Sequence, residues 1–165
     1  MVKDRRSLPA RWSNEIRAAI LALLTAGAAL LVAPADWFLR VHSIQVVQTA
    51  DGSAMVIQAR TVWPKDVLQV RWAASIETIL VEDDGATVGR LVCAGHGVST
   101  IRDTHYAVVR MPLADWVGDP NCAPPVGEPH FAEATWRFSI FGVTKTASKR
   151  SAAFTLATPA VGLNL

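Results

Sequence analysis

The feature that most constrains this chain is a run of eighteen uncharged, mostly apolar residues near its N-terminus, from Ala18 to Ala35. A helix of that length rises about 27 Å at 1.5 Å per residue, close to the ~30 Å hydrocarbon core of a bilayer. Trp12 before the run, and Trp37 and Phe38 after it, are the aromatic residues typical of membrane–water interfaces. The run therefore predicts one transmembrane helix in contact with the lipid bilayer.

Positive charge is concentrated before this run. Two acidic residues and five basic ones precede it, the basic ones being Lys3, Arg5, Arg6, Arg11 and Arg17. Residues 36–55 contain one Arg and no Lys. By the positive-inside rule, this asymmetry predicts a single-pass protein of an inner or plasma membrane. Residues 1–17 would be cytoplasmic, residues 18–39 would form a signal-anchor, and the remainder would be periplasmic or extracellular.

A cleaved signal peptide is the alternative interpretation of the same run. The tripeptide Ala33-Pro34-Ala35 fits an A-x-A cleavage site, and cleavage there would leave a mature chain beginning at Asp36. Seventeen residues precede the run, however, which is long for the charged region of a signal peptide. We therefore expect the anchor to be retained.

Small residues repeat at every fourth position of the predicted span, at Ala18, Ala22 and Ala26. Such a stripe lets two helices approach closely, which would suit a homo-oligomer or docking on another span. An alanine-rich anchor also produces stripes of this kind by chance, so both interpretations stay open.

The net charge of the chain is mostly a property of the anchor region. The whole chain carries +2, but residues 1–35 carry +3, which leaves −1 for residues 36–165. An almost neutral outer region lacks the basic surface that nucleic acids require, so we expect no nucleic-acid partner. Its size suits one domain, predicted at residues 40–158 and followed by an apolar tail at residues 159–165.

Two cysteines, Cys93 and Cys122, both fall on the predicted outer side. An even pair in an oxidising compartment predicts one disulfide. The alternative is a metal site, because His96 and His130 would complete a set of two thiolates and two imidazoles. Against it, the eight positions between Cys122 and His130 exceed the usual spacing of structural zinc ligands. We therefore expect a disulfide, and no cofactor.

From Arg40 onward the apolar residues alternate with period two or form short solid runs, which is typical of β-strands. Asp-Gly pairs at residues 51–52 and 84–85 predict hairpin turns. The segment at 118–129 contains four prolines and predicts a loop, and the basic segment 144–150 predicts a turn. The expected strands are residues 41–46, 54–62, 67–72 with or without 75–81, 88–93, 105–111, 131–141 and 152–156.

Seven or eight short strands separated by turns favour an all-β, immunoglobulin-like sandwich of two sheets. Immunoglobulin domains place a core Trp between their two cysteines, whereas here Trp72 precedes both cysteines and Trp116 lies near a loop. The expected disulfide therefore differs from theirs.

The arrangement of Asp115-Trp116, Cys122, Pro124-Pro125, Gly127 and Trp136 resembles small, uncharacterised membrane-anchored proteins of bacterial and phage genomes. The resemblance covers residues 60–156. It implies an anchor followed by a β domain, and it implies no activity.

No spacing typical of a catalytic site is present. His96, Ser99, Asp103 and His105 lie within ten residues, whereas the members of a hydrolytic triad come from separate elements around an oxyanion hole. There is no G-x-S-x-G elbow. We expect a binding protein rather than an enzyme, with a metal-handling or hydrolytic protein using the cysteine and histidine set as the alternative.

The last fifteen residues carry no charge. Water disfavours exposure of Val161, Leu163 and Leu165, so we expect them to dock on a partner or on lipid. The sequence hypothesis is thus a membrane-tethered binding or assembly module, an accessory subunit of a membrane or envelope-associated complex. Its partner, another protein or a second copy, is not identified by any motif.

Overall fold

The computed structural model describes residues 10–63, 68–81, 87–102 and 105–158 and divides the chain into two compact units, Met1–Ala33 and Pro34–Leu165. The first unit contains one helix, α1 (Ala10–Val32), of 23 residues. Its segment Asn14–Val32 has a mean hydropathy of 1.9, so the helix is long and apolar enough to cross a bilayer.

The helix starts earlier and ends earlier than the predicted anchor at residues 18–39. It ends at Val32 because Pro34 has no N–H to donate the next helical hydrogen bond and because its backbone is extended. The residues after Pro34 belong to the second unit, which begins with a short 3-10 turn, η1 (Ala35–Trp37), and enters its first strand at Leu39.

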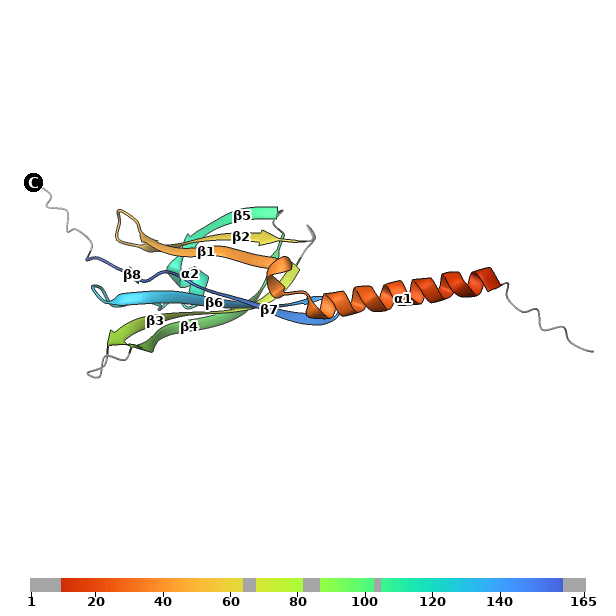
Figure 1. Cartoon of the computed structure of the whole chain (residues 1–165). Coiled ribbons are helices and arrows are strands. Elements are labelled where there is room, and N and C mark those ends of the chain that lie inside the picture. The colour runs from red at the N-terminus through yellow and green to blue at the C-terminus, as the bar shows by residue number, and fades with distance from the viewer. Residues whose placement is uncertain (1–9, 64–67, 82–86, 103–104, 159–165) are drawn as a thin grey trace, which may run out of the picture. The chain divides into compact units, whose positions relative to one another are not determined.

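The second unit consists of two antiparallel sheets, which Figure 1 shows as two layers. The smaller sheet has the order β1 (Leu39–Gln48), β2 (Ala54–Val62), β5 (His105–Pro112). The larger sheet has the order β4 (Thr87–Ile101), β3 (Leu68–Val81), β6 (Pro129–Ile140), β7 (Val143–Arg150), with β8 (Phe154–Thr155) beside β6. A short helix, α2 (Leu113–Val117), follows β5 and leads toward the larger sheet.

The core lies between the two sheets and follows the period-two pattern. Along β6 every second residue is buried, from His130 to Ile140, while Arg137 and Ser139 between them are exposed. Val70 and Ile76 on β3 and Val56 on β2 are fully buried. Because burial of such a side chain stabilises the fold by about 1.5–3 kcal/mol before entropy costs, this alternation fixes the strand register.

The first hairpin turn forms at the predicted Asp51-Gly52 pair. The Asp51 carboxylate accepts hydrogen bonds from the Thr49 hydroxyl and from the backbone N–H and hydroxyl of Ser53. These bonds, with Thr49 contributing most, lower the pKa of Asp51 to about 2. Gly52 has φ +87°, a backbone conformation that glycine adopts without strain.

Three parts of the sequence interpretation need correction. The segment predicted as a basic turn, residues 144–150, is strand β7; its lysines suit an edge strand, because charge there discourages pairing with another chain. β4 continues to Ile101 instead of ending near Cys93. Residues 113–117, which carried no expected element, form α2.

The true turn between β6 and β7 consists of Phe141 and Gly142, with φ +47° and +82°. A two-residue hairpin loop with both φ values positive matches the twist of its strands, and Asn-Gly is its preferred sequence. Phe141 is the only non-glycine residue with positive φ among the described residues. An L-residue with a bulky side chain is strained in this conformation by about 1–2 kcal/mol.

We expect Phe141→Asn to stabilise the protein by about 0.5–1 kcal/mol, because Asn tolerates positive φ and Phe141 has little contact to lose, being 83% exposed. The measurement is thermal unfolding of the full chain in detergent, in which the melting temperature should rise by a few degrees. Val126→Asn is the control: Val126 is also exposed but has no positive φ, so its replacement should leave the melting temperature unchanged. A decrease for Phe141→Asn would contradict the strain argument.

Candidate binding surface

Cys93 on β4 and Cys122 in the loop after α2 form a disulfide, as the cysteine count predicts. Their Cα atoms are 5.5 Å apart, and 29 positions separate them in the sequence. Neither cysteine is free. The bond ties the loop that follows the smaller sheet to an edge strand of the larger one.

The alternative metal set of Cys93, His96, Cys122 and His130 is wrong. Both sulfurs are bonded to each other, and the two imidazoles face opposite sides of the larger sheet: His96 is exposed, whereas His130 is fully buried. His130 already has partners, since its Nε2–H donates to the Pro125 carbonyl at 2.8 Å and its Nδ1 accepts from the Thr78 hydroxyl at 3.0 Å. Within the described ranges, no group of three or more His, Cys, Asp or Glu side chains could hold a metal.

The residues of the apparent hydrolytic set do not converge either. His96 pairs with Ala73 and Ser99 pairs with Val70, so the two side chains lie on opposite faces of β4. Asp103 and the side chain of His105 lie outside the described residues.

The predicted membrane-interface residues have different environments. Trp37 is 68% exposed, as an interface residue would be, and it remains a candidate. Phe38 is only 3% exposed, and the centre of its ring lies 6.2 Å from that of Trp63, with the two rings tilted, so it packs within the second unit. Its contact with a membrane interface stays a prediction. Trp12 lies on α1, but its side chain is not described, and Val161, Leu163 and Leu165 lie outside the described residues.

Two close approaches hold α2 and its loop against the larger sheet. A Cβ atom on Gly95 of β4 would come within 2.0 Å of the Val117 carbonyl oxygen, so this strand position requires glycine. Gly118, with φ +75°, ends α2 against the ring of Trp72. These contacts bring Cys122 to its partner on β4.

On the smaller sheet, α2 is fixed by a buried hydrogen bond from Trp116 Nε1 to Gln58 Oε1 at 3.0 Å. Both side chains are buried, and Gln58 Nε2 has no hydrogen-bond partner among the described residues. The bond from Trp116 therefore satisfies the carbonyl oxygen of the buried Gln58 amide, and it places Trp116 between the layers.

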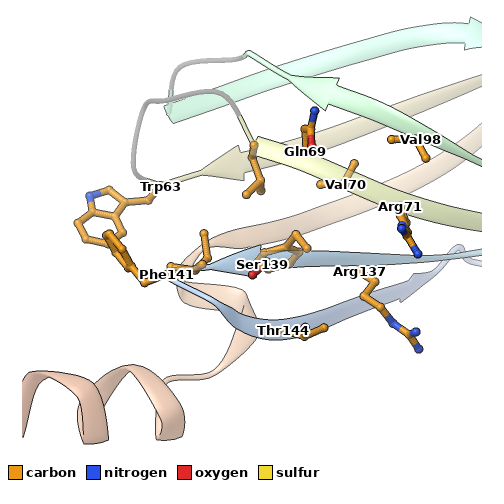
Figure 2. A pocket seen from close by; sticks show the side chains of 12 residues that line it. Trp63, Gln69, Val70, Arg71, Val98, Arg137, Ser139, Phe141 and Thr144 are labelled. Carbon is orange, nitrogen blue, oxygen red and sulfur yellow. The ribbon is translucent and has the colours of Figure 1, made fainter. Parts of the chain in front are cut away.

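A hollow with a volume of about 880 Å³ lies on the larger sheet, near the β6–β7 turn. Figure 2 shows the rings of Trp63 and Phe141 at one end and Arg71 and Arg137 toward the other. Val98, which is 70% exposed, lines it from β4. The hollow thus combines two cations with exposed apolar side chains.

Arg71 on β3 and Arg137 on β6 are directly opposite each other in the strand register. Neither forms an ion pair with any residue of the described ranges. Arg150 on the same sheet differs: it contacts Glu133 at 2.9 Å and Glu77 at 3.5 Å. The arginine pair was not singled out from the sequence, because only the register reveals that the two charges are neighbours.

No protein-family model and no curated protein sequence matches the chain. Solved structures similar to it include DesR, a β-glucosidase from Streptomyces venezuelae, with 14% identity and a TM-score of 0.35 over 69% of this chain and 15% of that one. Spo0M, a sporulation control protein from Bacillus subtilis, has 12% identity and a TM-score of 0.32 over 66% of this chain and 47% of that one. The chain therefore matches less than half the length of either protein, and neither likeness supports an argument about function.

We expect the double variant Cys93→Ser, Cys122→Ser to lose about 3.5 kcal/mol of stability, because the bond closes a loop of about thirty residues in the unfolded chain. Urea unfolding of the full chain in detergent measures this loss. Thiol labelling of the unreduced, denatured wild-type protein should find no free thiol. Two labelled thiols in the wild type would contradict the disulfide.

Proposed function

We propose that this protein is a membrane-tethered, non-catalytic binding or assembly module. Its helix would be retained as a single-pass anchor with the N-terminus in the cytoplasm, and the second unit would lie in the periplasm or outside the cell. The apolar composition of Asn14–Val32, the excess of basic residues before it and the presence of a disulfide in the second unit support this arrangement.

We further propose that the second unit is immunoglobulin-like. Support comes from the strand order, in which β1, β2 and β5 face a sheet ordered β4, β3, β6, β7. This order corresponds to the strands A, B and E facing a sheet built around C, F and G, with one added strand beside C. The disulfide departs from that family, because it joins β4 to the loop after α2 and not the two central strands.

The single observation that carries a binding role is the hollow beside the opposed arginines. Arg71 and Arg137 lie directly opposite each other, and neither has an acidic partner within the described ranges. Like charges in this arrangement destabilise a sheet. Trp63, Val98 and Phe141 are exposed around the same hollow, and a group of exposed apolar side chains is typical of a surface that contacts another molecule. The larger sheet is therefore the proposed binding surface for a protein partner, either a different protein or a second copy.

We expect a photo-crosslinking residue in place of Val98 to form a discrete protein adduct in the native membrane. The control replaces Val108 on β5, which is also exposed but lies on the smaller sheet, and it should give no such adduct. Denaturing gel electrophoresis separates the adducts, and mass spectrometry identifies them. Absence of an adduct at Val98 would contradict the binding role.

We expect a membrane-impermeant maleimide to label Val126→Cys in intact spheroplasts, because Val126 is exposed on the second unit. A cysteine at Ser7 should be labelled only after lysis, because this residue precedes the span. Labelling in the reverse pattern would contradict the proposed topology.

A further inference from the structure

The arginine pair limits the chemistry of a molecule that can occupy the hollow. Residues directly opposite on antiparallel strands have Cβ atoms about 4.5–5.5 Å apart, so the guanidinium groups of Arg71 and Arg137 can reach one common group. Guanidinium forks bind carboxylate and phosphate oxygens in pairs of parallel hydrogen bonds. A bound anion would also remove the repulsion between the two cations.

The neighbouring charges of the same sheet strengthen this assignment. Arg150 is neutralised by Glu77 and Glu133, and its guanidinium lies 3.7 Å from the centre of the Phe131 ring. The sequence thus supplies acidic partners for an arginine with a structural role. It supplies none within the described ranges for Arg71 and Arg137, which leaves both guanidinium groups open to an anionic group of another molecule.

The other end of the hollow requires an apolar group. Trp63 is 57% exposed and Phe141 is 83% exposed, and both rings line the hollow. Phe141 keeps its exposed ring at a position where positive φ disfavours it. A free inorganic anion would use the arginines but leave these rings in water, so the occupant combines an anion with an apolar group.

A protein segment fits these requirements better than the other common anionic macromolecules. The net charge of −1 on residues 36–165 gives no extended positive surface of the kind that attracts nucleic acid. A volume of about 880 Å³ holds a few side chains, and pockets of this size bind by apolar contact with a few placed polar groups.

We infer that the hollow binds an extended protein segment that places a Glu or Asp carboxylate between Arg71 and Arg137 and an apolar side chain against Trp63 and Phe141. This inference rests on the proposed binding function and specifies the chemistry of its partner. An anionic lipid headgroup, which shares the anionic chemistry, is the competing outcome of the test.

The experiment selects a phage-displayed library of random dodecapeptides on the full chain, incorporated in nanodiscs of neutral phosphatidylcholine. We expect enriched peptides to carry Asp or Glu near an aromatic or aliphatic residue. One enriched peptide is synthesised, and its affinity is measured by fluorescence anisotropy. The double variant Arg71→Gln, Arg137→Gln should weaken its binding at least tenfold, while its melting temperature stays equal or rises, because the repulsion is removed.

Two further variants separate binding from stability. Arg150→Gln removes an arginine that already has acidic partners, so it should leave the peptide affinity unchanged. Phe141→Asn should weaken peptide binding several-fold even though it stabilises the fold. Opposite changes in affinity and melting temperature cannot result from unfolding.

Enriched peptides without an acidic bias, or an affinity unaffected by loss of both arginines, would overturn the inference. The inference would also be overturned if no peptide is enriched and the emission of a fluorophore attached to Val98→Cys shifts to the blue in nanodiscs that contain phosphatidylglycerol. That result would assign the hollow to a lipid headgroup. If the crosslink at Val98 persists in the double arginine variant, the proposed binding function stands and only the carboxylate assignment fails. If no crosslink forms in the wild type, the binding function itself fails.

Discussion

The crossing from the smaller sheet to the larger one is the constraint on which the second unit depends. Between β5 and β6 the chain must pass from the smaller sheet to the larger one. It does so through α2, which is fixed to both sheets. Trp116 donates a hydrogen bond to Gln58 of the smaller sheet, and the Val117 carbonyl lies close to Gly95 of the larger sheet. The helix α2 thus contacts β2 and β5 of the smaller sheet and β3 and β4 of the larger one.

The disulfide completes the same crossing. Cys122 follows α2 by a few residues, and its bond to Cys93 fixes the loop to β4, an edge strand. The loop then returns to β6, where the Pro125 carbonyl accepts the Nε2–H of buried His130. Both cysteine and histidine thus serve one structural purpose, which explains why a metal-like set of residues in the sequence is not a metal site in the fold.

Much of the fold could be predicted because the core imposes a period of two. The hairpin at Asp51-Gly52 and the long alternating strand that became β6 follow from local pattern and turn chemistry. The β6–β7 hairpin could not be placed, because Phe141-Gly142 is an unusual sequence for its turn and the polar residues of edge strand β7 resemble a loop. α2 was missed because five residues are too few to show helical periodicity.

The candidate site depends on register, which the sequence does not display. Arg71 lies next to the half-buried Trp72, and Arg137 lies between the buried Trp136 and Phe138. Because side chains alternate along a strand, the sequence does indicate that both arginines point away from the core. Only the pairing of β3 with β6 places them opposite each other. The same region also holds the strained Phe141. The charge repulsion between the arginines and the backbone strain at Phe141 both occur around one hollow, and the proposed binding function would account for both.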